Sequence, residues 1–368
     1  MKLRFVHCSD LHLGAPYSML PREAADRRRA DQRETFARIV DLAIKPQERA
    51  DLLLLTGDTF DSANPSPRDV GFLRGQLQRL GDAGVKTFAI PGNHDPWREK
   101  SFWAKAAFPF ARFFRNPVLE QEELRGLGIS VWAIAPDSSN LTKNQLAQIS
   151  MPEGAGVSLL MCHGSWLNFG IETADCHPFS THDVRNLPFA YVALGHYHAC
   201  RQIEGPVPAA YPGTPEALGF SRNDLGDRHV VIGTIADGKT DIRFHKINIV
   251  SHVSEEFDCT AESYDSLRRK VESILSPSCY VRIQLKGCPS VDVIAGLERL
   301  KEELSDMCAY LRIDSPFSSV GDVPADNVYL KRFMEKMKER IGEAGDERKP
   351  LLNKALELGI RAFARNVN

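Results

Sequence analysis

The chain has 368 residues, of which 43% are hydrophobic and 26% charged, and its formal net charge is -2 at pH 7. This length exceeds one typical domain, and the composition suits a globular protein with a sizeable core, so two domains are the first expectation. The near-neutral charge excludes a globally basic nucleic-acid binder, and the lack of any run of about 18 apolar residues excludes a membrane-spanning helix.

The amino-terminal segment becomes polar by His7, too early for a secretory signal sequence. The eight cysteines are scattered, and none forms a Cys-x-x-Cys pair. Disulfides and a cysteine-based metal site are therefore disfavoured, and we expect reduced thiols in a cytoplasmic protein.

Strands and helices alternate through the first two hundred residues. Residues 2–8 are rich in strand formers, and residues 30–45 carry apolar side chains at helical spacing. The uninterrupted leucines at 52–55 predict a parallel strand buried on both faces. Segment 66–69 combines an N-cap serine, a first-turn proline and a returning acid, which begin a second helix. Further strands are predicted over residues 85–90, 129–135, 157–161 and 191–194.

A short polar motif follows each of five predicted strands. The motifs are Asp10-Leu11-His12, Gly57-Asp58, Gly92-Asn93-His94-Asp95, His163-Gly164 and Gly195-His196-Tyr197-His198. Open α/β sheets gather ligands at the carboxyl ends of their strands, so these distant motifs are expected to converge.

The residue types of these motifs predict a pair of divalent cations. Carboxylate, amide oxygen and neutral imidazole suit Mn²⁺, Fe²⁺ or Zn²⁺ better than Ca²⁺. Two such cations, held roughly 3.5–4 Å apart, can hydrolyse a phosphate ester, and a shared carboxylate must hold them against their mutual repulsion. Asp58, at the end of the most buried strand, is placed to be that carboxylate.

Beyond about residue 205 the helical signal fades, and residues 230–235 and 242–247 predict a hairpin with its turn at Asp237-Gly238. A second unit then begins near residue 250. It reads as a small α/β domain with strands over 252–257, 280–285 and 309–313, and helices over 263–275 and 291–304.

Two apolar stripes follow this second unit. One consists of Leu330, Phe333, Met334, Met337 and Ile341, and the other of Leu352, Leu356 and Phe363. They predict a helical tail. This tail could dock to a partner or fold back onto its own chain, and the sequence favours neither. The expected domains are therefore residues 1–249, 250–323 and 324–368.

The five motifs, in this order, resemble the calcineurin-like metallophosphoesterase superfamily over about residues 2–250. Segments 8–14, 55–61 and 211–216 are similar to the SbcD-type subunit of the double-strand-break repair nuclease. This resemblance implies an α/β fold, a metallophosphoesterase β-sandwich flanked by helices, with a small α/β capping domain and a helical C-terminal tail.

The resemblance also implies roles for the motif residues. One cation would be held by Asp10, His12 and His198, the other by Asn93, His163 and His196, with Asp58 between them. His94 would contact the scissile phosphate and help the leaving oxygen depart, and Asp95 would orient or polarise His94. The attacking group would be a bridging hydroxide, displaced in line without a covalent enzyme intermediate. Manganese is the expected metal, with iron, zinc or magnesium as alternatives.

The leading functional expectation is a Mn²⁺-dependent DNA exonuclease and endonuclease subunit that acts in DNA repair. The implied partners are DNA and an SbcC-type coiled-coil ATPase, and a homodimer is left open. No Gly-x-x-x-x-Gly-Lys-Ser/Thr motif is present, so ATP hydrolysis would come from the partner.

Two other functions remain open. One is a small-substrate phosphodiesterase, acting on nucleotides or cyclic nucleotides, or a phosphatase of the same superfamily. The protein-phosphatase branch is disfavoured because its Gly-Asp-x-Val-Asp-Arg-Gly and Gly-Asn-His-Glu patterns are absent. The other is a scaffold that bridges an ATPase to DNA.

Several other features favour structural readings. A group of arginines interleaved with acids predicts a solvated helix face: Arg22, Arg27, Arg28, Arg29 and Arg33. The aromatic residues within 102–114 are expected to pack against the sheet rather than stack on bases. Trp97 and Trp166 each follow a metal motif and would wall the site. His7 is expected in the core, and His177 and His182 at the surface.

Overall fold

The computed structural model describes most of the chain and divides it into two compact units, Met1–Ile249 and Val250–Asn368. The predicted boundary between residues 323 and 324, and the side chains of Leu330 and Phe363, lie outside the described part. The described residues are 2–105, 108–137, 141–150, 156–167, 176–260, 262–287, 291–315, 328–345 and 347–365.

The first sheet of unit 1 has the strand order β12-β11-β1-β2-β3-β4. Strands β1 to β4 are parallel, and β11 and β12 form an antiparallel hairpin, as predicted. Asp237 and Gly238, with φ of 50° and 73°, make the hairpin turn. The strands are Lys2–Cys8 (β1), Leu52–Thr56 (β2), Lys86–Ile90 (β3), Ala111–Phe113 (β4), His229–Ala236 (β11) and Lys239–Lys246 (β12).

The second sheet has the order β5-β6-β7-β8-β10-β9. Strands β6, β7, β8 and β10 are parallel, and the edge strands β5 and β9 are antiparallel to their neighbours. The strands are Glu120–Leu124 (β5), Ile129–Ile134 (β6), Val157–His163 (β7), Tyr191–Gly195 (β8), Arg201–Ile203 (β9) and Ala209–Tyr211 (β10).

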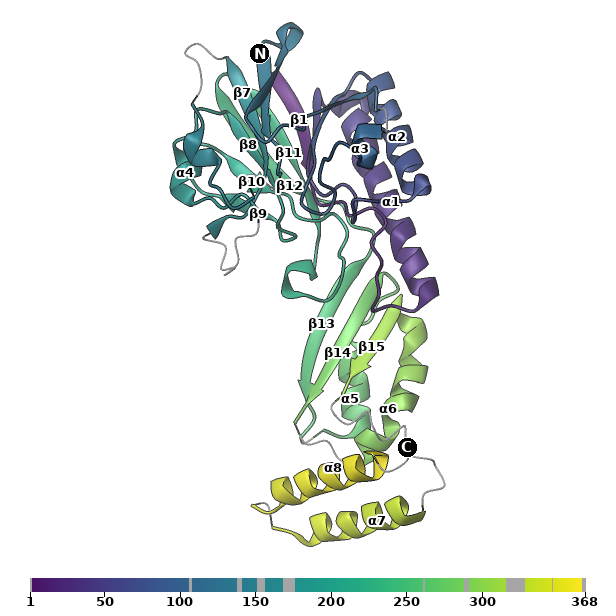
Figure 1. Cartoon of the computed structure of the whole chain (residues 1–368). Helices are drawn as coiled ribbons and strands as arrows, with labels where there is room; N and C mark the ends of the chain where they lie inside the picture. Colours follow the sequence, from purple (N-terminus) through teal and green to yellow (C-terminus); the bar gives the residue numbers. More distant parts are fainter. Residues whose placement is uncertain are drawn as a thin grey trace. The chain divides into compact units, whose positions relative to one another are not determined.

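The two sheets pack face to face, with helices on the flanks (Figure 1). Leu52 and Leu54 enter the core between the sheets, whereas Leu53 and Leu55 enter the core beneath α1 and α2. This arrangement confirms the predicted α/β class and the strand buried on both faces. The helices of unit 1 are Arg22–Ile44 (α1), Pro67–Asp82 (α2), Phe102–Lys105 (α3) and Thr181–Arg185 (α4).

Helix α1 begins well before the predicted residue 30. The buried face of its first half carries polar side chains, including Arg28, Gln32 and Thr35, so the apolar stripe is missing there. The prediction of a solvated arginine face is wrong for Arg28, which is fully buried. The aromatic residues after β3 pack as predicted, with Trp103 stacked on Phe113 at a centroid distance of 4.3 Å.

Arg28 is buried because a carboxylate from a distant loop pairs with it. Its guanidinium donates to Glu216 at 2.7 Å and to Asp31 at 3.0 Å. Glu216 also accepts from the Thr35 hydroxyl at 2.7 Å and from the Ile249 backbone N–H at 2.6 Å. One carboxylate thus joins α1, the loop after β10 and the last residue of unit 1.

Unit 2 contains a parallel three-stranded sheet of order β13-β14-β15. Its helices pack on the sheet through a core that includes Leu267, Val271 and Leu300. The predicted strand–helix alternation is confirmed. The elements are Ser251–Asp258 (β13), Tyr264–Glu272 (α5), Cys279–Lys286 (β14), Val291–Leu304 (α6) and Tyr310–Asp314 (β15).

The tail forms two helices that pack on each other, Val328–Glu343 (α7) and Lys349–Arg365 (α8). Gly359 makes room for Phe333, because a Cβ there would lie 2.1 Å from the Phe333 ring. Leu351 and Leu358 remain exposed, and docking of a partner stays a prediction. Within the described part of the chain, the helices lack the length and apolar character needed to cross a bilayer.

We expect Glu216→Ala to lower the free energy of unfolding by about 3 kcal/mol, because it removes the fully buried partner of Arg28 and leaves the guanidinium only the partly exposed Asp31 carboxylate. The matched control is Glu34→Ala on α1, the helix that carries Arg28. The exposed Glu34 carboxylate pairs with exposed Arg38. That change should cost less than about 0.5 kcal/mol. Urea unfolding followed by circular dichroism measures both, and equal stabilities would contradict the account.

Candidate metal centre

The nine predicted site residues all lie at or just past the carboxyl ends of β1, β2, β3, β7 and β8. The first three strands belong to one sheet and the last two to the other. Four of the nine have a positive φ, which residues other than glycine rarely adopt: Asp10 (φ 52°), His12 (45°), Asp58 (46°) and His196 (111°). Such backbone strain costs about 1–3 kcal/mol per residue and clusters at functional sites.

The motif glycines are required because the strand ends approach one another closely. A Cβ on Gly92 would lie 2.0 Å from Asp58 Oδ1, and one on Gly57 would lie 2.2 Å from His163 Nδ1. A Cβ on Gly195 would lie 1.8 Å from the Thr56 carbonyl oxygen. Each glycine therefore leaves space for a metal-ligand side chain or for the backbone that supports one.

The first group of ligand atoms comes from Asp10, His12 and His198, which lie within 4.8 Å of one another. The Asp10 carboxylate accepts the His196 backbone N–H at 3.1 Å. His12 Nδ1 lies 3.1 Å from Asp61 Oδ1, and His198 Nδ1 lies 3.5 Å from Asp224 Oδ1. These bonds orient both imidazoles.

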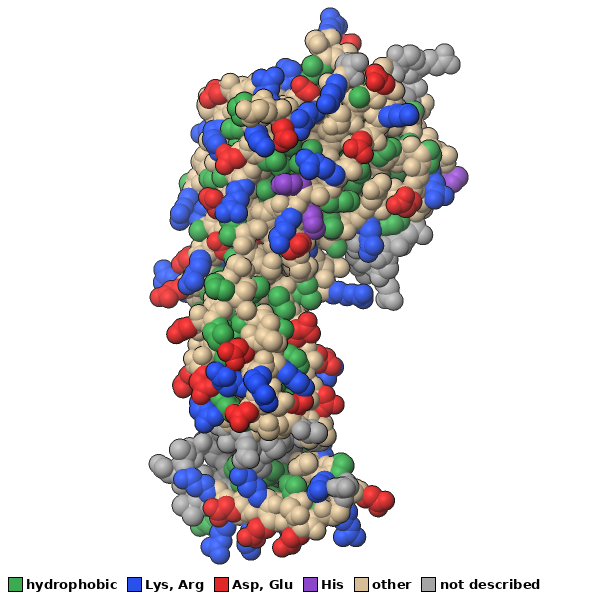
Figure 2. All heavy atoms as spheres, turned by 180° about the vertical axis from the view of Figure 1, so that it is seen from behind, with side chains coloured by type: hydrophobic (Ala, Val, Ile, Leu, Met, Phe, Trp, Pro, Cys, Tyr) green, Lys and Arg blue, Asp and Glu red, His purple; other side chains and the backbone are tan. Residues whose placement is uncertain are grey.

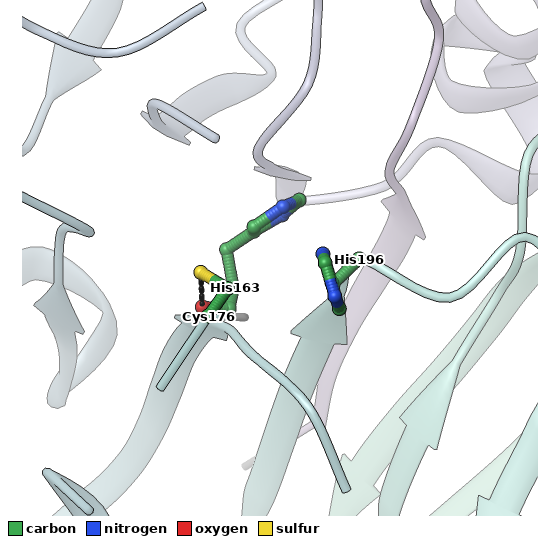
Figure 3. A group of neighbouring side chains, drawn as sticks. All are labelled: His163, Cys176 and His196. Carbon is green, nitrogen blue, oxygen red and sulfur yellow. Dashed lines mark hydrogen bonds between the residues drawn. The ribbon is translucent and has the colours of Figure 1, made fainter. Parts of the chain in front are cut away.

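The second group surrounds the side-chain oxygen of Asn93. That oxygen lies 2.9 Å from His163 Nε2 and 3.1 Å from His196 Nδ1. His163 Nδ1 lies 2.9 Å from the Thr56 carbonyl oxygen, which can only accept, so Nδ1 carries the proton and Nε2 has the free lone pair of the neutral ring. The two imidazoles project from the ends of neighbouring strands (Figure 3).

Asp58 lies between the two groups. Its Oδ2 is 3.4 Å from His163 Nε2 and 3.8 Å from His12 Nε2, and its Oδ1 accepts the His94 backbone N–H at 2.8 Å. Burial opposes ionisation of Asp58, but His163 and His12 lower its carboxyl pKa. Burial likewise opposes protonation of His163, but Asp58 outweighs it and raises the imidazole pKa to about 9. The centre is thus built to hold positive charge.

These residues fit a pair of divalent cations. His12 Nε2 is buried and has no hydrogen-bond partner among the described residues, although its Nδ1 is engaged by Asp61. His12 Nε2 and His163 Nε2 both face the Asp58 carboxylate, the arrangement expected of ligands that share a metal centre. The donor set of imidazole, carboxylate and amide oxygen suits Mn²⁺, Fe²⁺ or Zn²⁺.

The structure does not give Asp95 its expected role of orienting His94. The Asp95 carboxylate is buried and accepts the backbone N–H groups of Gly92 at 2.8 Å and Phe60 at 3.1 Å. The His94 ring is exposed, and its Nδ1 lies 3.2 Å from the Asp61 carbonyl oxygen instead. Both Asp95 carboxylate oxygens accept backbone hydrogen bonds, so Asp95 stabilises the loop that carries His94.

Sequence reasoning assigned no role to four residues that support the ligands. Asp61 and Thr56 both lie within segment 55–61, already notable for its similarity to the nuclease branch, so both offered a signal. Asp224 offered none. The Cys176 thiol donates to the His163 carbonyl oxygen at 3.3 Å, and its sulfur lies beside His163 and His196 (Figure 3).

The remaining histidines divide between core and surface. His7 is buried as predicted and bonds to Tyr191 and Thr56. His182 is exposed, as predicted. The surface expectation for His177 is wrong, because it packs beneath Gly164, where a Cβ would lie 2.7 Å from the His177 carbonyl oxygen. Burial, with the nearby charge of His163, lowers the pKa of His177 to about 4.

Comparison with known proteins gives a consistent result. A family model described as calcineurin-like phosphoesterase matches residues 3–200. The chain is 28% identical over 297 residues to a Bacillus subtilis (strain 168) protein named uncharacterized metallophosphoesterase YhaO, covering 78% of this chain and 70% of that protein.

Several relatives carry the name DNA double-strand break repair protein Mre11, among them two that align along most of the chain. The Sulfurisphaera tokodaii protein is 26% identical over 336 residues, covering 85% of this chain and 80% of the relative. The Sulfolobus acidocaldarius protein is 24% identical over 367 residues, covering 89% and 90% respectively.

We expect Gly92→Ala to weaken Mn²⁺ binding by roughly tenfold or more, because its methyl group would displace the Asp58 carboxylate. Gly71→Ala on α2 is the matched control, since a Cβ at that position meets nothing within 4 Å. Titration calorimetry on chelator-treated protein measures both affinities. Unchanged binding by the Gly92 variant would mean that Asp58 does not depend on this close approach.

Asp61→Ala should lower Mn²⁺ affinity by about 10- to 100-fold, because His12 loses the acceptor that fixes its ring. Asp41→Ala removes a carboxylate that is 60% exposed and pairs with a surface arginine, and it should leave the affinity unchanged. The same calorimetry applies, with thermal unfolding as the check on folding. If the two variants bind Mn²⁺ equally well, Asp61 is not a positioning residue.

Proposed function

Because the chain belongs to the calcineurin-like phosphoesterase family, we propose that it is a metal-dependent DNA exonuclease and endonuclease subunit acting in DNA repair. The observation that carries this proposal is the convergence of two ligand groups from two sheets on the Asp58 carboxylate. A buried carboxylate with an imidazole nitrogen from each ligand group beside it is suited to a phosphodiester site with two cations.

The family uses a dinuclear metal centre, and Mn²⁺ is the proposed metal. We assign Asp10, His12 and His198 to one cation, Asn93, His163 and His196 to the other, and Asp58 to both. Bound cations supply Lewis-acid activation of water and neutralise charge on the phosphate. The protein's own part is to hold these ligands at fixed orientation through Asp61, Asp224 and the Thr56 carbonyl.

His94 is the proposed proton donor to the leaving oxygen. Its backbone N–H is fixed by Asp58, and the Asp61 carbonyl keeps a proton on Nδ1 in every charge state. The remaining nitrogen, Nε2, is therefore the atom that transfers a proton. After transfer, the neutral Nδ1–H form keeps its bond to the carbonyl. Because the ring is exposed, it can reach a bound phosphodiester.

Two observations support DNA as the substrate. The relatives named for DNA double-strand break repair align along most of the chain, beyond the residues that the family model matches. Figure 2 shows histidine side chains at the surface of unit 1 with lysine and arginine side chains near them, which offers local contacts for a phosphate backbone despite the net charge of -2. We also propose a cytoplasmic location and docking of an SbcC-type ATPase on α7 and α8.

With Mn²⁺ and end-labelled linear duplex, we expect the protein to release nucleotides. His94→Gln should lower kcat by about 10²- to 10⁴-fold while Mn²⁺ affinity is retained, because only proton transfer is lost. Asp58→Ala should abolish both activity and paired metal binding. Glu123→Ala, at an exposed carboxylate of β5, is the control and should match the native rate.

The same assay includes bis-p-nitrophenyl phosphate and a phosphopeptide. Turnover of the small diester without nucleotide release would favour a small-substrate phosphodiesterase. Turnover of the phosphopeptide alone would favour a phosphatase. DNA binding without any hydrolysis would favour a bridging scaffold, and each of these results would overturn the proposed nuclease.

A further inference from the structure

A cavity of about 110 Å³ lies beside the metal centre. Asn93 forms part of the cavity wall, and its amide oxygen is the atom that meets His163 and His196. A group occupying this cavity would therefore lie next to whatever is bound at the second ligand group.

The cavity has a mixed lining, in which the side chains of Asn93, Arg98 and Asp137 are polar and the others are apolar. Trp97 lines it together with Pro136 and Leu141. The indole is half-buried and packs against the core beneath α1 and α2, and the Arg115 guanidinium lies over it at 5.2 Å. Contacts of this kind fix the orientation of the ring, so Trp97 is a rigid part of the cavity wall.

A positively charged side chain, that of Arg98, also lines the cavity. Arg98 is exposed, and its guanidinium has no hydrogen bond or ion pair to any other residue in the described ranges. The unpaired guanidinium, the aromatic ring and the proposed phosphodiester site each match one part of a nucleotide chain. These parts are a planar ring, a neighbouring phosphate and the phosphate under attack.

We propose that this cavity holds the base of the nucleotide next to the scissile phosphate, with the ring against Trp97 and the adjoining phosphate on Arg98. The inference rests on the proposed function and deepens it, because it assigns a nucleoside-binding subsite to the same centre. A base is favoured over an amino-acid side chain because aromatic stacking and a free guanidinium together select a ring that carries phosphate. Stacking accepts any base, so the subsite would impose little sequence preference.

Two p-nitrophenyl diesters test the proposal, p-nitrophenyl thymidine 5′-phosphate and p-nitrophenyl methyl phosphate. They share the scissile bond and the leaving group and differ only in the nucleoside. Trp97→Ala should raise KM for the thymidine ester by roughly tenfold, the scale of one lost stacking contact, and leave the methyl ester unchanged. Trp97→Phe keeps an aromatic surface and should recover most of the difference.

Arg98→Gln should weaken cleavage of short oligothymidylates, which carry the adjoining phosphate, but not cleavage of the mononucleotide ester. Arg125→Gln, at a side chain that is 88% exposed and distant in sequence, is the matched control. Equal losses on both diesters in the Trp97→Ala variant, with Trp97→Phe normal, would show that the indole only supports Asn93. That result would overturn the nucleoside subsite and leave the proposed function standing.

Calorimetry decides the inference even when neither diester is cleaved, an outcome that would count against the proposed function alone. Thymidine 5′-monophosphate should bind more tightly than deoxyribose 5-phosphate to the native protein, and Trp97→Ala should remove the difference. If the native protein binds both phosphates equally, the cavity does not recognise a base.

Discussion

The Asp58 carboxylate is the interaction on which the candidate site depends. It contacts groups from three other motifs, since it accepts from the His94 backbone and faces both His12 and His163. Those groups belong to both sheets of unit 1, so Asp58 lies where the sheets come together. The glycines around it follow from this crowding, because a methyl group at Gly92 or Gly57 would occupy the space of a ligand.

The electrostatics of the centre follow from the same arrangement. Asp10 and Asp58 are both buried, and two carboxylates out of water destabilise the fold unless positive charge accompanies them. Imidazoles supply part of that charge, since Asp58 raises the pKa of His163 and Asp224 raises that of His198, both against the effect of burial. Divalent cations would supply it more completely, because several ligands can share one centre of charge. Bound metal would therefore stabilise unit 1.

The sequence predicted the strands that carry the site because those strands are parallel, buried on both faces and ended by polar motifs. The run at 52–55 and its following Gly57-Asp58 are the plainest case, since both cores take alternate leucines from it. The short strands β4, β9 and β10 have three residues each, too few to display a period. Arg28 and Asp224 could not be predicted, because burial of a charge depends on a partner far away in the chain. Asp95 was assigned to the wrong neighbour because adjacency in sequence says nothing about which donors a loop turns toward a carboxylate.

The loop that follows β10 shows how such distant pairs reach the metal centre. The Thr214 backbone N–H donates to the His198 carbonyl oxygen at 3.1 Å, and the Arg228 side chain donates to the Thr214 carbonyl oxygen at 2.9 Å. Two residues later, Glu216 is held by Arg28 and itself holds the Ile249 backbone. The position of His198 therefore depends on a buried ion pair that lies outside every metal motif. The same carboxylate accepts from the backbone N–H of Ile249, the last residue of unit 1. Loss of the Arg28–Glu216 ion pair would therefore weaken the support of both the His198 loop and Ile249.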